Sequence, residues 1–397
     1  MSDTATDRRV STTHPTADSI RVAHVGELSE TSASGVDRTV AGLVTHLGPF
    51  GVTPEVWHLS NRYASVRERR SGTIRVFELP SHPRLRSAAS RLPKATRRFI
   101  HERRQQIDVL HLHSVFIPDN VWVVREARLP YVITPNGGYS REVIHGRNRL
   151  AKAIWMRMRE RRYIRDASLV HAVSPPELDE LRATFRTGSF LYAPNAIDAS
   201  TVPLVAANRV APPRGVVFLG RLDVAHKGLD LLLEGYARYI AEHGAAGVEL
   251  IVAGPDVRSG MATLKAMSEA LPSETQPRFL GPVFGDDKEA LLKAAYVFVH
   301  TSRWEGMPYA VLEALATGCP VLITAATNLG AFVTEYGAGV VVDATAEDIA
   351  GALASLVDLP PEKYRRMCSD ARKLAQERFS WTAVAEEISA AYRTLVP

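Results

Sequence analysis

The sequence predicts an α/β protein of two consecutive doubly wound domains, each with a parallel sheet between layers of helices. Short, almost continuous apolar runs alternate with helix-length segments through most of the chain, a pattern typical of strands that are buried on both faces. The alternation stops once, at residues 199–215, where Pro, Ala and Val occur without a helical period. The length of 397 residues suits two domains of ordinary size.

The predicted strands form two series, one on each side of this interruption. The first series comprises IRVAHVGEL from Ile20, DVLHLHS at Asp108–Ser114, PYVIT at Pro130–Thr134 and SLVHAV at Ser168–Val173. The second series comprises GVVFLG at Gly215–Gly220, VELIVAG at Val248–Gly254, YVFVHTS at Tyr296–Ser302, PVLIT at Pro320–Thr324 and GVVVD at Gly339–Asp343. The segment after Ser380, a suitable N-cap, has apolar residues at helical spacing and predicts a closing helix.

We therefore expect four parts: a disordered tail (1–19), an N-terminal Rossmann-like domain (20–205), a C-terminal Rossmann-like domain (206–378) and the closing helix (379–397). The tail is polar and lacks the apolar segment of a secretory signal. The sequence has no run of about 18 apolar residues, so we expect no membrane span. Its two cysteines, Cys319 and Cys368, have no metal-ligand spacing and fit a reducing compartment. A cytoplasmic protein is the expectation.

The formal charge of +5 conceals an asymmetry between the two halves. Residues 1–205 hold 30 basic and 20 acidic residues, whereas the remainder holds 18 and 23, so the halves are expected to meet different partners. Arginine-rich runs occur at residues 84–104 and 141–165. The second run mixes Ile154, Trp155 and Met158 with arginines, which suits a helix at the surface of an anionic membrane, on the inner face. A solvated surface helix is the alternative, and nothing indicates a nucleic-acid-binding module.

Two carboxylates eight positions apart dominate the stretch SRWEGMPYAVLEALATGCPVLIT at residues 302–324. Glu305 lies in the loop after a strand, and Glu313 is the only charge in a helix expected from Pro308 to Thr317. A buried carboxylate is unfavourable unless donors bond to it, and the two hydroxyls of a sugar diol are suitable donors. Exposed surface charges are the alternative interpretation of this spacing.

Two further segments come directly after predicted strands. In FLGRLDVAHKGLDLLLEGY, Arg221 and Lys227 occupy a loop beside a helix start, an arrangement that suits a diphosphate. In SASGVDRTVAGL, Gly35 precedes a helix and would let the backbone approach a phosphate or a sugar. Because ligands of open parallel sheets bind beyond the carboxyl ends of the strands, these segments predict one site in a cleft between the domains.

Together these motifs resemble the retaining nucleotide-sugar glycosyltransferases of family 4, which have the GT-B fold. The resemblance extends from about Ile20 to Tyr392, and its most specific parts are the E-x7-E spacing and the segment GRL…KGLD. It implies that the two domains face each other across a cleft and that the final helix crosses back to the N-terminal domain.

The resemblance also implies roles for single residues. Arg221 and Lys227 would hold the donor diphosphate, Glu305 would contact the transferred sugar and Glu313 the nucleotide ribose. The other donor-binding residues would be Gly35, Val283 by its backbone, Gly306, Met307 and Pro308.

One residue departs from the family pattern. In TPNGG, Asn136 stands where many relatives have a histidine that faces the donor sugar. An amide can bond a sugar hydroxyl but cannot carry a proton, so Asn136 is expected to bind donor without acid–base chemistry. Gly137, Gly138 and His113 are candidates for the acceptor side, although a histidine satisfied in the core is an alternative for His113.

The resemblance implies a hexosyltransferase of the 2.4 class that uses a nucleotide-diphosphate sugar, UDP-sugar before GDP-mannose, and an acceptor hydroxyl on a glycan, a lipid or a small molecule. No D-x-D motif is present, so neither a metal ion nor another cofactor is expected. A non-catalytic nucleotide-sugar-binding protein and a sugar-nucleotide epimerase on the same fold are the alternatives.

Overall fold

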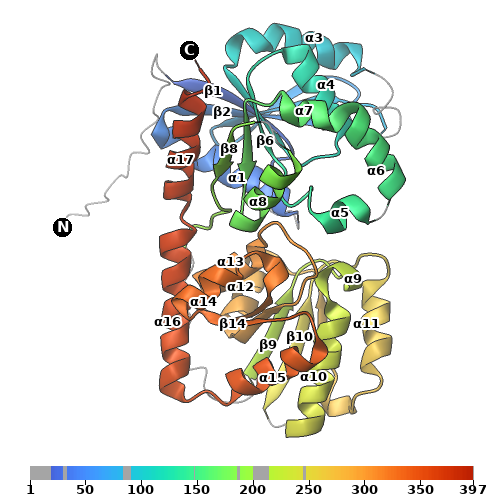
Figure 1. Ribbon diagram of the computed structural model, residues 1–397, viewed down its shortest axis with the longest axis vertical. Coiled ribbons are helices and arrows are strands. Elements are labelled where there is room, and N and C mark those ends of the chain that lie inside the picture. Colours follow the sequence, from blue (N-terminus) through green and yellow to red (C-terminus); the bar gives the residue numbers. More distant parts are fainter. Residues whose placement is uncertain are drawn as a thin grey trace, which may run out of the picture.

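A computed structural model describes residues 19–29, 34–83, 91–146, 148–185, 188–199, 214–244 and 247–396. Within these ranges the chain forms two α/β domains, one above the other in Figure 1, each with a sheet between helices. The predicted fold class is therefore confirmed. The expected tail, apart from residue 19, and the expected boundary between residues 205 and 206 lie outside the described residues.

The N-terminal sheet has eight strands in the order β3-β4-β2-β1-β5-β6-β7-β8. These strands are β1 Ile20–Val25, β2 Val52–Ser60, β3 Arg67–Ser71, β4 Ile74–Pro80, β5 Val109–His113, β6 Tyr131–Thr134, β7 Leu169–Ala172 and β8 Phe190–Tyr192. Neighbours are parallel except β3 and β4 at the edge. Four strands were not predicted, because β2 and β4 are interrupted by charged residues, β3 reads RERRS, and β8 has three residues.

The C-terminal sheet has six strands in the order β11-β10-β9-β12-β13-β14, and all of its pairs are parallel. These strands are β9 Arg214–Leu219, β10 Val248–Ala253, β11 Arg278–Gly281, β12 Ala295–His300, β13 Val321–Thr324 and β14 Gly339–Val342. Five of them were predicted from apolar runs. The edge strand β11 was missed because its sequence, RFLG, is short and starts with a charge.

The helices of the N-terminal half are α1 Gly35–His46, α3 Lys94–Arg103, α4 Pro118–Ala127, α5 Arg141–His145, α6 Arg149–Trp155, a π-helical turn at Met156–Glu160, α7 Arg161–Arg165 and α8 Pro175–Thr184. Those of the C-terminal half are α9 Val224–Lys227, α10 Leu229–His243, α11 Gly260–Ser268, α12 Gly285–Ala294, α13 Tyr309–Ala316, α14 Gly330–Tyr336, α15 Ala346–Val357, α16 Pro361–Arg378 and α17 Trp381–Arg393. In the described part of the chain, no helix combines the length and the apolar composition that a membrane span requires.

Both faces of each sheet are buried, as the apolar runs predict. In β9, Val216 and Phe218 belong to one hydrophobic cluster, while Val217 and Leu219 point to the opposite face and belong to another. Successive side chains of a strand alternate between faces, so an uninterrupted apolar run requires a core on each side. The second of these clusters continues into the N-terminal domain, where it includes Leu43.

The final two helices connect the domains. α16 packs along the C-terminal domain, and α17 continues beside α1 of the N-terminal domain (Figure 1). Trp381, at the start of α17, stacks on His46 and lies so close to Gly42 that a Cβ atom there would be 1.8 Å from its ring. The predicted crossover is confirmed, although the Ser380 side chain makes no capping hydrogen bond.

α17 also covers a group of buried histidines on one face of the N-terminal sheet. The Nδ1 atom of His24 on β1 lies 3.1 Å from the Nε2 atom of His113 on β5. Within the described residues, His24, His111 and His113 are the one set of side chains whose ligand atoms lie within 4.8 Å, near enough to share a metal ion. The ring nitrogens of His111, however, lie 2.5 Å from the Tyr392 hydroxyl and 2.6 Å from the Thr134 hydroxyl, so hydrogen bonds hold this ring.

The histidines of this group are held in the neutral state. Burial lowers the pKa of His24 to about 3 and that of His171 to about 4. Burial, followed by repulsion from the other imidazoles, lowers the pKa values of His111 and His113 well below the ordinary value. All four would ionise near pH ~6.5 in an unfolded chain.

We predict that the free energy of unfolding falls as the pH decreases below ~6.5. The pKa values of these histidines are lower in the folded state, so the unfolded chain takes up protons on acidification that the folded chain does not. At one pH unit below its unfolded pKa, each histidine should lower the free energy of unfolding by about 1.4 kcal/mol. Urea unfolding on both sides of this pH would measure the change.

A pair of variants isolates the buried group. His24→Asn should remove the contribution of one histidine to the acid sensitivity, whereas His145→Asn, at an exposed position outside this group, should leave it unchanged. An unfolding free energy that is independent of pH in this range would contradict the prediction.

Candidate active site

A cavity of about 680 Å³ lies between the two domains. All of the predicted site residues except His113 line it: Gly35, Asn136, Gly137, Gly138, Arg221, Lys227, Val283, Glu305, Gly306, Met307, Pro308 and Glu313. His113 lies instead in the buried histidine group, 2% exposed. The structure therefore brings together the sequence motifs from both domains, and it places His113 away from the cavity, as the core alternative for this residue anticipated.

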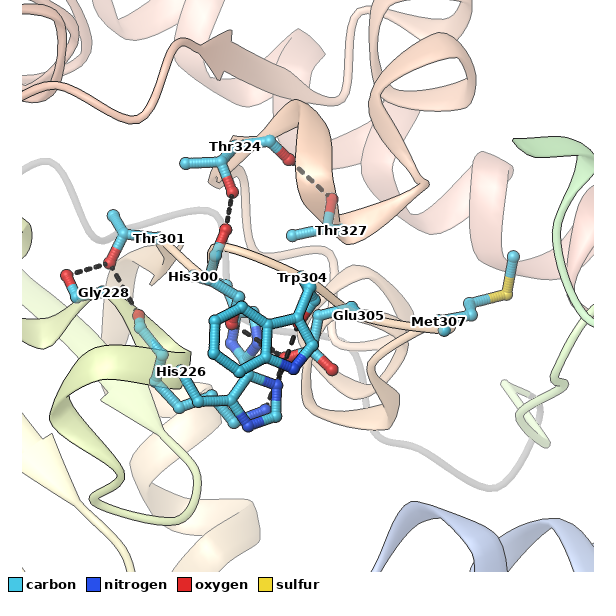
Figure 2. A network of polar contacts seen from close by, with 12 residues as sticks. His226, Gly228, His300, Thr301, Trp304, Glu305, Met307, Thr324 and Thr327 are labelled. Carbon is cyan, nitrogen blue, oxygen red and sulfur yellow. Dashed lines mark hydrogen bonds and ion pairs between the residues drawn. The ribbon is translucent and has the colours of Figure 1, made fainter. Parts of the chain in front are cut away.

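The loop that carries Glu305 is held by side chains on three sides. The Thr324 hydroxyl donates to the Ser302 carbonyl, and the Thr301 hydroxyl donates to the carbonyls of Lys227 and Gly228 (Figure 2). The Asn328 amide donates to the carbonyls of Glu305 and Gly306, at 2.8 and 2.9 Å. These bonds replace the regular pairing that ends with β12, so the loop has a defined shape without strand or helix.

Glu305 is the centre of a cluster of donors, all of which contact its Oε1 atom. The Lys227 Nζ atom lies at 2.5 Å, the Ser302 hydroxyl at 2.8 Å and the His300 Nε2 atom at 3.0 Å. Burial disfavours the charged carboxylate, but the attraction of Lys227 and the hydrogen bond from His300 outweigh it, and the pKa of Glu305 is lowered. Glu305 is thus an anion in a site closed to most solvent.

Lys227 reaches Glu305 because of how α9 begins and ends. The Asp223 side chain caps the helix by accepting from the His226 N–H, and Gly228 ends it with a left-handed φ of 60°. A Cβ atom at Gly228 would lie 2.1 Å from the Thr301 carbonyl oxygen, so a larger residue would push the β12 loop away. Arg221, earlier in the same loop, also lines the cavity.

A stacked pair of rings covers this cluster. His226 lies flat on Trp304, with ring centroids 4.5 Å apart, and its Nε2 atom donates to the Trp304 carbonyl at 2.9 Å (Figure 2). Burial, with repulsion from Lys227, lowers the pKa of His226 to about 4. His226 is therefore neutral at physiological pH and adds no charge to the site.

Glu313 is buried in α13, so the alternative interpretation of an exposed surface charge is wrong for this residue. Its Oε1 atom accepts from Arg38 at 2.5 Å and from Lys288 at 2.6 Å. Burial disfavours ionisation, and the two cations outweigh it, so the pKa of Glu313 is lowered. α13 begins at Tyr309 and ends at Ala316, one residue inside each predicted limit, and Pro308 is its N-cap residue instead of part of its first turn.

In both carboxylates, one oxygen contacts the cations and the other does not. In each, the cation contacts found within the described residues engage Oε1. The Oε2 atoms of Glu305 and Glu313 accept none of these bonds and belong to residues that line the cavity. A carboxylate can accept about four hydrogen bonds, so each has capacity left for ligand donors.

The two domains meet at a pair of glycines beside the cavity. A Cβ atom at Gly306 would lie 2.9 Å from the Asn136 carbonyl carbon, and one at Gly137 would lie 2.9 Å from the Gly306 Cα atom. The preceding residue, Asn136, has a left-handed φ of 53°, a conformation that asparagine adopts more readily than most residues. Its amide donates to the Thr134 carbonyl at 3.2 Å.

The buried carboxylate of Glu177 holds the same loop by hydrogen bonds. The N–H groups of Gly137 and Val173 donate to Glu177 at 2.6 and 2.8 Å. Burial raises the pKa of Glu177 to about 7, against the effect of these two donors. Glu177 thus positions the Asn136–Gly137 backbone against the C-terminal domain.

Sequence reasoning missed several residues of the site. Arg38 and Lys288 each lie three residues after a glycine at a helix start, Gly35 and Gly285, and so on the same helix face as that glycine. That spacing was a usable signal. Asn195 and His300 had no such signal in the sequence. Asn195 donates to the Met307 carbonyl at 3.0 Å across the domain boundary. His300 is the last residue of an apolar strand.

Both halves of the chain match known families. Residues 34–195 match the family described as "Glycosyl transferase 4-like domain", and residues 207–374 match "Glycosyl transferases group 1". The chain is 26% identical over 252 residues to mannosylfructose-phosphate synthase of Agrobacterium fabrum, which covers 59% of this chain and 55% of that protein. It is 31% identical over 182 residues to D-inositol 3-phosphate glycosyltransferase of Rhodococcus opacus, which covers 45% and 40%. The chain thus spans about half the length of these relatives.

The fold has close counterparts among solved structures. Sucrose-phosphate synthase of Thermosynechococcus elongatus aligns with a TM-score of 0.72 over 95% of this chain and 99% of that chain, at 19% identity. At this identity the likeness concerns the fold alone.

The buried pair of Lys227 and Glu305 leads to a prediction about stability. Glu305→Gln should lower the free energy of unfolding by about 3 kcal/mol, because Lys227 then remains buried without a compensating charge. Adding Lys227→Met should restore most of this loss, because no buried charge is left. Chemical denaturation of both variants would measure the difference.

The matched control is Glu234→Gln, which removes one partner of an exposed pair with Arg238 and should change the unfolding free energy by less than about 0.5 kcal/mol. Equal destabilisation by the single and double variants would show that Lys227 and Glu305 are not coupled.

Proposed function

The chain belongs to the glycosyl transferases of group 1, since its C-terminal half matches that family and its N-terminal half matches the glycosyl transferase 4-like domain. On that premise we propose that it is a retaining hexosyltransferase. It moves a hexosyl unit from a nucleotide-diphosphate sugar to an acceptor hydroxyl. The observation that carries the proposal is the convergence in one cavity of two ionised, buried carboxylates and four cations, Arg38, Arg221, Lys227 and Lys288.

The cations suit a diphosphate that gains charge during the reaction. In the proposed step, the bond between the hexose anomeric carbon and the phosphate oxygen breaks, and a bond from the acceptor oxygen forms on the same face. The acceptor proton passes to the departing phosphate. Arg221 and Lys227 stabilise the leaving group most in the transition state, where its charge is greatest. Lys227 gives one of its three N–H donors to Glu305 and keeps the others for phosphate.

The carboxylates suit the two sugars of the donor. Glu305 binds the hexose and Glu313 binds the ribose, each through the Oε2 atom that its cations leave unengaged. A ribose at Glu313 brings the donor phosphates toward Arg38 and Lys288, which already contact that carboxylate. Val283 and Phe284 line the end of the cavity near Lys288 and suit a nucleobase.

The donor and the acceptor are proposed as chemical classes and not as single compounds. UDP-sugar is the first donor to test and GDP-mannose the second. The acceptor is a glycan, a lipid-linked sugar or a small molecule, and phosphorylated polyols belong among the acceptors to test because the two relatives are named for a sugar phosphate and an inositol phosphate. A cytoplasmic location is part of this proposal.

A non-catalytic nucleotide-sugar-binding protein is the second candidate, because Asn136 cannot transfer a proton. The experiment that separates the two is a screen of nucleotides by thermal shift, followed by a donor hydrolysis assay with product identification. Binding at about 100 times the Kd should stabilise the protein by roughly 2.7 kcal/mol. Donor binding without either hydrolysis or transfer would favour the non-catalytic candidate.

The two carboxylates should differ in the ligand groups they bind. Glu313→Gln should weaken binding of the nucleoside diphosphate, since losing hydrogen bonds to a charged group removes about 1.5–3 kcal/mol, or roughly 10- to 150-fold in affinity. Glu305→Gln should not weaken diphosphate binding, because the ligand has no hexose and Lys227 is released from a competing anion, and it should lower turnover instead. Calorimetry with the diphosphate, alongside turnover, would measure both.

The control for this comparison is Glu335→Gln, at an exposed position of the same domain, which should change neither quantity. Equal loss of diphosphate affinity in the Glu305 and Glu313 variants would show that the roles are assigned wrongly.

Turnover should survive EDTA. The sequence has no D-x-D pair, and the four cations of the cavity can neutralise a diphosphate without a divalent ion. The assay compares turnover with and without EDTA after removal of free metal. Activity that is lost with EDTA and restored by Mg²⁺ or Mn²⁺ would overturn this part of the proposal.

A further inference from the structure

Three large apolar side chains project from one helix into solvent. Leu150, Ile154 and Met158 are 75%, 59% and 61% exposed, whereas the other exposed large apolar side chains of the described residues, Met267, Leu280 and Phe284, range from 37% to 45%. The three lie four residues apart on α6 and the π-helical turn directly after it, so they share one side of this segment.

The opposite side of the segment is anchored to the protein core. Trp155 and Met156 pack against the hydrophobic cluster of the N-terminal domain. The Trp155 indole donates to Glu160 at 2.5 Å, and the buried Glu160 also accepts from the Tyr139 hydroxyl at 2.7 Å. Trp155 is therefore an anchor and not a surface residue as the sequence suggested, and the exposed side is held in a fixed orientation.

The charges around these side chains are almost all positive. Five arginines of the same segment are exposed: Arg149, Arg157, Arg161, Arg162 and Arg165. Between residues 148 and 166, all of which the structure describes, the one exposed acid is Asp166, and it pairs with Arg162 and Arg165. An apolar stripe flanked by arginines complements a surface that is anionic outside and apolar beneath, which describes a bilayer with acidic lipids.

We propose that this surface, Leu150, Ile154 and Met158 with the flanking arginines, docks the protein on anionic lipid membranes. The apolar side chains enter the boundary between headgroups and acyl chains, and the arginines contact lipid phosphates. Docking requires no glycosyl transfer, so it stands apart from the proposed function.

The position of the surface beside the cavity gives docking a consequence that rests on the proposed function. α5 lies on the side of the N-terminal domain that faces the C-terminal domain, and α6 packs next to it (Figure 1). Val143 of α5 lines the cavity, and its carbonyl accepts from Lys152 of α6 at 2.5 Å. A membrane bound to α6 therefore lies next to the acceptor side, and the acceptor class best placed there is a sugar or alcohol carried on a lipid.

The test is co-sedimentation of the full chain with protein-free vesicles of phosphatidylcholine alone or mixed with phosphatidylglycerol, at low and high salt. The wild-type protein should bind the mixed vesicles at low salt, bind the neutral vesicles weakly, and lose binding as salt screens the arginines. Arg157→Gln with Arg161→Gln should reduce partitioning about 25-fold, since each arginine near the surface is worth about fivefold.

The apolar contribution is tested by the triple variant Leu150→Ser, Ile154→Ser, Met158→Ser, which should reduce partitioning by about 100-fold or more. Its control is Met267→Ser with Leu280→Ser, which changes exposed apolar side chains of the other domain and should leave vesicle binding unchanged. All of these sites are exposed, so an unchanged thermal midpoint should confirm that the variants fold. Wild-type protein that stays in solution with mixed vesicles at low salt, or a triple variant that binds like the wild type, would overturn the proposal.

A donor hydrolysis assay without vesicles keeps this result separate from the proposed function. The triple variant should hydrolyse donor at the wild-type rate while failing to bind vesicles. If the wild-type protein binds vesicles but hydrolyses no donor, the docking proposal is supported. That result counts only against the proposed transferase function.

Discussion

The ion pair between Lys227 and Glu305 is the interaction on which the cleft depends. Both side chains are about one-tenth exposed, so each charge is tolerable there only because the other is present. The pair joins the end of α9 to the loop after β12. That loop in turn brings Gly306 against Gly137 and presents the Met307 carbonyl to Asn195. The contact between the domains therefore depends on a charge pair formed inside the C-terminal domain.

The second carboxylate links the domains directly. Arg38 extends from α1 of the N-terminal domain to Glu313 and also lies over the Tyr309 ring, 4.6 Å from its centroid. Tyr309 in turn donates to Thr39 at 3.1 Å. Together with α17, whose Trp381 belongs to a hydrophobic cluster that spans both domains, these contacts hold the two domains together beside the cleft. Under the proposed function, a bound donor takes over Arg38 and Lys288 as phosphate partners, so ligand binding and the domain contact use the same side chains.

Several local features could be predicted from the sequence and others could not. The apolar strands were visible because burial on both faces leaves no polar alternation to obscure them. The strands β3 and β11 were invisible because edge strands tolerate charge and need few residues. The site segments were found from the residues directly after each strand, since parallel strands deliver their carboxyl ends to one edge. The location of His113 could not be decided from the sequence, which allowed either the acceptor side of the cleft or the core. The reason is that periodicity does not reveal whether a side chain at the end of β5 reaches the cleft.

By itself, the sequence determined the fold class, the closing helix after Ser380 and the set of segments that meet in the cleft, because these depend on apolar periodicity and on residues at strand ends. That this helix crosses back to the N-terminal domain was implied by the family resemblance and not by periodicity. Only the tertiary structure decided the partners of the two carboxylates. Glu305 and Glu313 are bound by Lys227, Arg38 and Lys288, which lie 78, 275 and 25 positions away in the chain. Pairing over such distances depends on how two sheets and two domains are oriented, which no local pattern records. The same holds for Asn136, whose left-handed backbone lies against Gly306 across the cleft.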